Sequence, residues 1–214
     1  MTDLFRLIAA ERKTTADLLD SLSDEQAAID SLCRGWQVRH VAAHLTMPFT
    51  LSTPQMILGM VKRLGDFNRL SDDFAKATAD RPVAELAATL RANADHRFTP
   101  PGLGAHAPLT DIVVHTLDMR VPLGLPGPGP APEALDEILS FLMTRAATRG
   151  FLPKDRVPGL CFASDDTGWT AGDGPLVAGP GASLVVAITG RRAGLDGLHG
   201  DGLEVLRERL PAAR

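Results

Sequence analysis

Two predicted helical segments of this chain each place metal-ligating side chains one turn apart. His40 and His44 are four residues apart, as are Asp111 and His115. Residues at this spacing share one face of a helix, and the apolar residues between Asp111 and His115 mark a segment that should be buried. An imidazole or carboxylate buried without a partner costs a few kcal/mol. These side chains therefore need either a metal ion or a hydrogen-bond network.

An aspartate and a histidine on one helix, joined by a histidine from another, supply the ligands that zinc or nickel accepts. The residues alone leave three alternatives open: a metal at His44, Asp111 and His115, a chelate of His40 with His44, and a metal-free polar network. His40 follows Arg39 near the predicted helix start, which favours an exposed position or one behind the ligands. Asp118 is expected to hold the imidazole of His115, with a fourth ligand as the alternative.

Several other residues offer chemistry with a weaker pattern. Cys33 precedes a Gly-Trp pair and is either a thiol activated at a helix N-terminus or a small buried residue, and the second is favoured. Arg191 and Arg192 end a predicted helix, where such a pair either complements the helix dipole or binds an anion. Trp36 is expected to pack the helices. Three histidines carry no pattern and are expected to be exposed: His96, His106 and His199.

Helical spacing and Pro or Gly breaks predict the elements that position these residues. Helices are expected over residues 3–21, from 36 to the prolines at 48 and 54, and over 55–64, 83–95, 108–121 and 133–148. Short strands are expected at 160–163, 168–170 and 175–180. Residues 182–189 suit a helix or a strand, and a helix is favoured because it completes an α+β module ending in a helix at 202–210. The Pro-Gly segment 125–132 is a linker.

These elements predict a mainly α chain with a helical bundle over residues 1–150 and a small α+β domain over 151–214. The 214 residues, 44% of them apolar, are enough for one large domain or two small ones. A net charge of -4 without basic runs argues against nucleic acid and membrane surfaces and favours small-molecule partners. Two distant cysteines indicate a reducing compartment. The lack of a signal-peptide or membrane-span pattern predicts a cytoplasmic protein.

The two motifs resemble the DinB-like metalloprotein superfamily and, within it, the mycothiol-dependent maleylpyruvate isomerase family. Residues 35–45, a Gly-Trp turn leading into a helix that ends in His-Leu, are similar to the family's first metal motif. Residues 111–118, followed by 122–124, are similar to the second. Residues 184–191 and 198–202 are similar to the family's small C-terminal domain. The resemblance thus covers nearly the whole chain.

The resemblance implies a DinB-like up-and-down four-helix bundle that binds zinc through His44, Asp111 and His115, followed by a small α+β C-terminal domain. The enzyme after which the family is named has glutamate where this chain has Asp111, and the shorter side chain would shift the metal or admit another water. An arginine of the C-terminal domain stands near the metal in this family, and Arg191 is its counterpart, with Arg192 as the alternative. Nickel is the second choice of metal.

The resemblance also implies a low-molecular-weight thiol as cosubstrate, and mycothiol is the expected one because the Ala-, Arg-, Gly- and Leu-rich composition with few lysines fits an actinobacterial source. A metal-bound thiolate would add to an activated double bond, giving an isomerase or an S-transferase for a small electrophilic substrate. Arg191 would hold a substrate carboxylate and stabilise enolate charge. A non-catalytic metal- or ligand-binding protein is the alternative function. The sequence leaves open whether the chain is a monomer or a homodimer.

Overall fold

The computed structural model describes residues 2–100, 102–125 and 129–212. The chain forms two compact units, which we describe separately. The helical unit comprises residues 8–98 and 118–125, and the sheet unit comprises residues 1–7, 99–117 and 126–214. Helices α1 (Leu4–Asp20) and α8 (His106–Leu123) each contribute residues to both units.

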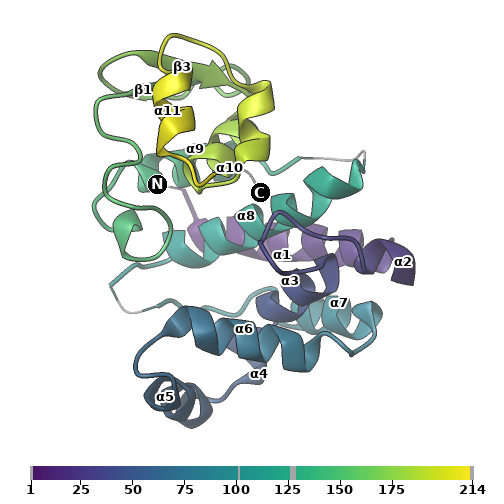
Figure 1. Ribbon diagram of the computed structural model, residues 1–214. Coiled ribbons are helices and arrows are strands. Elements are labelled where there is room, and N and C mark those ends of the chain that lie inside the picture. The colour runs from purple at the N-terminus through teal and green to yellow at the C-terminus, as the bar shows by residue number, and fades with distance from the viewer. Residues whose placement is uncertain (1, 101, 126–128, 213–214) are drawn as a thin grey trace. The chain divides into compact units, whose positions relative to one another are not determined.

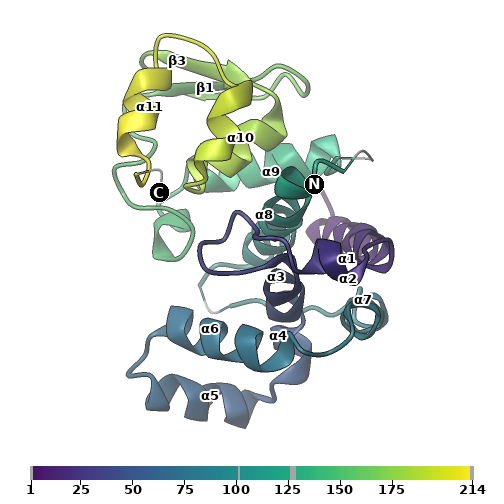
Figure 2. The same cartoon turned by 45° about the vertical axis from the view of Figure 1, so that its right-hand side comes forward.

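The helical unit is built from most of α1 and a series of shorter helices (Figure 1). These are α2 (Asp24–Ala27), α3 (Val38–Leu45), α4 (Met47–Thr50), α5 (Thr53–Lys62), α6 (Phe67–Thr78) and α7 (Val83–Ala92). Helix α3 packs against both α6 and α7, and α5 lies beside α6 (Figure 2). The fully buried apolar residues of these helices include Val41 and Ala42 on α3 and Leu86 and Leu90 on α7. Helix α3 is therefore fixed on two sides.

The sheet unit combines helices with one small sheet. Its elements after α8 are α9 (Pro132–Leu142), the 3-10 turn η1 (Ala147–Arg149), β1 (Cys161–Ser164), β2 (Thr170–Gly172), β3 (Leu176–Gly179), α10 (Gly181–Ile188), the 3-10 helix η2 (Arg192–Gly197) and α11 (Leu203–Arg209). The strand order is β2-β1-β3, with β1 antiparallel to β2 and parallel to β3. Helix α10 packs against α9 and η2. Its apolar residues Leu184 to Ile188 are all buried and form the core of this unit.

Two glycines make close turns possible. Gly35 has φ +79°, in the left-handed region that lets the chain turn before Trp36. Gly172 has φ +87°, and a side-chain carbon there would lie 2.3 Å from the carbonyl oxygen of Leu160. Any side chain at position 172 would therefore break the pairing of β1 with β2.

The predicted fold class is confirmed, because the chain is mainly helical with a small α+β part. Residues 182–189 are helical as favoured, and all three predicted strands are present within a few residues of their expected positions. Helix α6 was not predicted. The last predicted bundle helix ends at Leu142 instead of continuing to 148. Within the linker, residues 126–128 lie outside the described residues, and the division of the chain at residue 150 stays a prediction.

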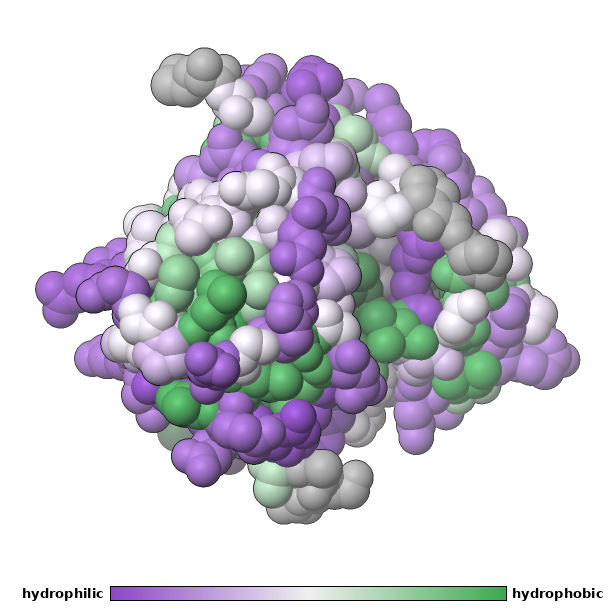
Figure 3. Space-filling view, turned by 90° about the horizontal axis from the view of Figure 1, so that it is seen from above, coloured by the Kyte–Doolittle hydropathy of each residue, from purple (hydrophilic) through white to green (hydrophobic). Residues whose placement is uncertain are grey.

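The surface is largely hydrophilic on the face drawn in Figure 3, where hydrophobic residues gather in separate patches. Across the described part of the chain, the helices are all too short or too polar to span a membrane.

Candidate metal centre

Asp111 and His115 lie one turn apart on α8, in the sheet unit. The residues around them on α8 are almost all apolar and buried: Leu109, Ile112, Val113, Val114 and Leu117. The side chain of His115 is 15% exposed and that of Asp111 is 38% exposed. The sequence pattern therefore located two polar side chains among buried apolar residues of α8, with enough exposure to meet a ligand.

The spacing of this pair fits two ligands of one metal ion. Nε2 of His115 lies 3.5 Å from Oδ1 of Asp111, which is longer than a good hydrogen bond of about 2.7–3.2 Å. Two ligand atoms at about 2.0–2.2 Å from a tetrahedral zinc ion lie about 3.4 Å apart. The distance between the two side chains on α8 is therefore compatible with two ligands of one ion.

His44 lies on α3 in the helical unit and is only 7% exposed. Its Nδ1 is 2.7 Å from the hydroxyl of Ser71 on α6. The ring of Trp36 lies beside the imidazole, with the ring centres 5.3 Å apart and the planes tilted by 49°. Since Nδ1 faces Ser71, a metal bound by His44 would meet Nε2. A ring nitrogen is the atom through which histidine commonly binds zinc.

Trp36 is itself held by α6. Its Nε1 donates a hydrogen bond to Oδ1 of Asp72 at 2.8 Å, and Nζ of Lys76 donates to Oδ2 of the same carboxylate at 2.8 Å. The bonds from Lys76 and Trp36 stabilise the charged carboxylate and lower the pKa of Asp72. Beside the packing that the sequence predicted, Trp36 thus connects Asp72 of α6 to the imidazole of His44.

His40 caps the start of α3. Its Nδ1 accepts a hydrogen bond from the main-chain N–H of Gln37 at 3.0 Å, which satisfies one of the donors left without a partner at a helix N-terminus. Partial burial, and then the charge of Arg39, lower the pKa of His40. A supporting role for His40 behind the metal ligands stays a prediction.

Asp118 is fully buried in the helical unit. Its Oδ2 accepts a hydrogen bond from the thiol of Cys33 at 3.0 Å, and its main-chain oxygen accepts one from Leu32 N at 3.0 Å. Asp118 therefore anchors the loop that leads to Trp36. Whether it also holds the imidazole of His115 stays a prediction. Cys33 is half-buried, and it lies in the loop before α3 rather than at the first turn of that helix.

Arg191 and Arg192 follow the C-terminal end of α10, in the sheet unit. Arg191 is half-buried, and its Nη1 donates to the main-chain oxygen of Thr189 at 2.7 Å. Arg192 Nη1 donates to the main-chain oxygen of Arg207 at 3.2 Å, at the end of α11. The first guanidinium thus turns back to α10 and the second reaches α11. Which of them binds an anion stays a prediction.

Of the histidines expected to be exposed, His96 and His199 are exposed. The expectation for His106 is wrong. Its ring stacks on Phe141 with centres 5.5 Å apart, and its Nε2 lies 3.2 Å from Oε2 of Glu137. Its position at the start of α8 brings it against α9, a contact that local sequence pattern does not reveal.

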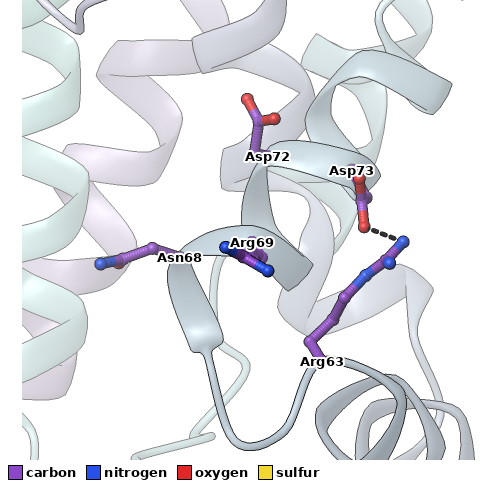
Figure 4. A pocket seen from close by; sticks show the side chains of 5 residues that line it. All are labelled: Arg63, Asn68, Arg69, Asp72 and Asp73. Carbon is purple, nitrogen blue, oxygen red and sulfur yellow. Dashed lines mark ion pairs between the residues drawn. The ribbon is translucent and has the colours of Figure 1, made fainter.

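A charged pocket lies between α5 and α6 of the helical unit. It is lined by Arg63, Asn68, Arg69, Asp72 and Asp73, and Figure 4 shows Arg63 and Asp73 as an ion pair there. The lining that the structure describes includes none of the three predicted metal ligands. Because opposite charges already pair within it, this pocket is a weaker ligand site than the histidine and aspartate set.

Ser71 and Asp72 are the functional residues that the sequence reasoning missed. Both lie on α6, which was not predicted. A signal for this helix exists in the sequence: Asp66 precedes it, its carboxylate accepts from Arg69 N at 3.1 Å as an N-cap, and apolar residues follow at helical spacing. The cap and the spacing together would have placed Ser71 on the buried face.

The chain is mainly helical with a DinB-like fold, and it carries histidine and aspartate residues that are candidates for binding a divalent metal. Residues 8–99 match the family described as mycothiol maleylpyruvate isomerase N-terminal domain. This match agrees with the family that the sequence resembles, and that prediction is confirmed.

Two solved structures are similar to the chain. One is the mycothiol-dependent maleylpyruvate isomerase, with a TM-score of 0.52 and 16% sequence identity. The other is a histidine-to-alanine mutant of such an isomerase, with a TM-score of 0.52 and 15% identity. Each similarity covers 94% of this chain and 96% of the other. At these identities the similarity establishes the fold. No curated protein sequence matches the chain.

Proposed function

We propose that this protein is a metal-dependent enzyme that uses a low-molecular-weight thiol, mycothiol, either to isomerise a small electrophilic substrate or to transfer the thiol to it. The family of residues 8–99 supports the thiol, since its name includes mycothiol. Metal binding is supported by the pair on α8, where the distance between Asp111 and His115 is compatible with two ligands of one ion. The name of the similar solved enzyme supports isomerisation as the first activity to test.

His44, Asp111 and His115 are the ligands in this proposal. Two imidazoles and one carboxylate are a donor set that suits zinc, with nickel as the second choice. A catalytic zinc site has three protein ligands and keeps a position for an exchangeable group. The donor set therefore fits an open catalytic site better than a closed structural one. Asp111 is one methylene shorter than the glutamate of the family's enzyme. Activity in this protein would therefore mean that the shorter carboxylate supports the same reaction.

Bound zinc would promote the ionisation of a coordinated thiol near neutral pH. The protein's own residues must then hold the electrophile. A guanidinium binds a carboxylate through two parallel hydrogen bonds and stabilises negative charge that develops next to it. In the proposal Arg191 does this, and Arg192 is the alternative. The substrate class is accordingly a small activated alkene that carries a carboxylate.

The test is the turnover of an activated cis-unsaturated acid by the purified protein, followed by absorbance and by analysis of the products. We expect turnover to require both added mycothiol and bound metal, and to be absent from the chelated protein and from His44→Ala. Isomerised product without net thiol consumption identifies an isomerase, and a stable thioether identifies an S-transferase.

A panel of thiols and electrophiles that shows no metal-dependent rate would overturn the enzymatic proposal. If the same protein nevertheless binds about one metal ion per chain, the alternative function applies: a non-catalytic protein of this fold that binds a metal or a small ligand.

A further inference from the structure

Helix α6 holds the proposed metal-binding histidine through a buried hydrogen bond. Ser71 is 5% exposed and His44 is 7% exposed, and the hydroxyl of Ser71 lies 2.7 Å from Nδ1 of the imidazole. The two residues are 27 positions apart in the chain and meet because α3 packs against α6. Helices α3 and α6, with Trp36 before α3, all belong to the helical unit.

The direction of this bond decides which nitrogen of His44 can bind a metal. A neutral imidazole has one nitrogen that donates and one that accepts. A histidine that binds a metal through Nε2 must carry its proton on Nδ1 and give that proton to an acceptor. The hydroxyl of Ser71 lies at Nδ1 and can accept a proton from it or donate one to it, according to the tautomer. When the hydroxyl accepts, the proton is on Nδ1 and the lone pair of Nε2 can bind an ion.

The ring plane of His44 is fixed by the next residue of α6. Asp72 holds the indole of Trp36 through Nε1 at 2.8 Å, and that indole lies against the imidazole. Ser71 thus contacts Nδ1 of the His44 ring, and the next residue, Asp72, holds the indole that lies against that ring. The carboxylate side chain of Asp72 is 40% exposed, whereas Ser71 is buried, so the bond from Ser71 is the less screened of the two.

We propose that Ser71 is a positioning residue that sets the tautomer and orientation of His44 so that Nε2 binds the metal. The inference rests on the proposed function, because it takes His44 to be a ligand. Loss of a partner behind a metal-binding histidine typically lowers metal affinity by about 10- to 100-fold. Ser71→Ala should therefore weaken zinc binding by about that factor without unfolding the protein.

The experiment compares the wild type with Ser71→Ala, Ser71→Thr and Thr46→Val. Zinc affinity is measured by competition with a chromogenic chelator, and stability by urea unfolding of the metal-free protein. Ser71→Thr keeps the hydroxyl and should restore affinity. Thr46→Val is the matched control, because Thr46 is fully buried two residues after His44, yet its hydroxyl donates to the main-chain oxygen of Ala43 at 2.7 Å. Its loss should lower stability but leave zinc affinity within about twofold.

A second readout does not need metal. Nitrogen-15 spectra of the metal-free protein in alkaline buffer, where histidine is neutral, report which ring nitrogen carries the proton, and the His44 signals are those absent from His44→Gln. We expect a proton on Nδ1 in the wild type and in Ser71→Thr, and a mixture of tautomers in Ser71→Ala.

The outcomes separate this inference from the proposed function. If the wild type binds zinc and Ser71→Ala binds it equally well, the inference is overturned and the metal site stands. If the wild type binds no zinc, the proposed function is overturned, and the tautomer alone then decides whether Ser71 positions His44. An Nε2–H tautomer in the wild type, or an unchanged tautomer in Ser71→Ala, contradicts the inference in either case.

Discussion

The thiol of Cys33 donates a hydrogen bond to Oδ2 of Asp118 at 3.0 Å, across 85 positions of the chain. The carboxylate is fully buried, and the main-chain oxygen of Asp118 accepts a second bond from Leu32 N. A buried carboxylate is tolerated only when such bonds replace water. Asp118 therefore fixes the loop that carries Trp36 toward His44.

Replacing Asp118 with alanine should destabilise the protein by about 1–3 kcal/mol, because the donors at Cys33 and the surrounding buried groups lose their acceptor. Urea unfolding of the metal-free protein measures this. Cys33→Ser keeps a donor at the same place and should cost less than Asp118→Ala. Equal midpoints for Asp118→Ala and the wild type would show that the buried carboxylate contributes nothing.

The protein should bind about one divalent metal ion per chain, and His44→Ala, His115→Ala and Asp111→Ala should each lose it after dialysis against a mild chelator. The reason is that two remaining ligands hold zinc far less tightly than three. Elemental mass spectrometry measures the stoichiometry. His199→Ala is the control, since His199 is exposed. Retention of stoichiometric metal by both histidine variants of the site would refute the assignment.

Arg191→Ala should leave the metal content unchanged and reduce turnover by ~10²-fold or more, the size of one lost charge contact to a transition state. Steady-state kinetics and metal analysis are done on the same preparation. Arg191→Lys keeps a charge but not the two-pronged geometry and should recover only part of the rate. Arg192→Ala is the matched neighbour, and a larger effect there than at Arg191 would move the anion site by one residue.

The stability of the helical unit should fall as the pH falls below about 6.5, the ordinary pKa of histidine. Burial lowers the pKa of His40 in the folded protein, so between the lowered pKa and about 6.5 the unfolded chain binds more protons than the folded one. Stability therefore rises with pH across that window. Protonation of Nδ1 would also remove the acceptor for Gln37 N.

This pH dependence is measured by urea unfolding of the wild type and of His40→Gln from acid to neutral pH. Glutamine at this third position of a helix can still accept from the cap N–H, yet it does not titrate. The variant should show a flatter dependence below about pH 6.5. Identical slopes for the two proteins would mean that His40 does not contribute to the acid sensitivity.

Helix α6 shows why part of the fold escaped prediction. Its buried residues are only Leu70, Ser71 and Ala75, and charged residues fill the positions between them. One of the three buried residues is polar, so the cap at Asp66 and the apolar spacing had to be taken together to predict this helix. Helix α8 shows the opposite case, because its apolar residues predict the helix, and the four-residue spacing of Asp111 and His115 places these two candidate ligands on one face.

The sequence by itself determined the local features: the mainly helical class with a small α+β part, the three candidate ligands, and the family of residues 8–99. These follow from spacing within one element, which the periodicity of a helix or strand fixes. The tertiary structure alone decided that Ser71 faces His44, that Asp72 holds Trp36, and that Cys33 bonds to Asp118. These partners are 27 to 85 residues apart, and such contacts depend on how the helices pack, which spacing along one helix does not encode.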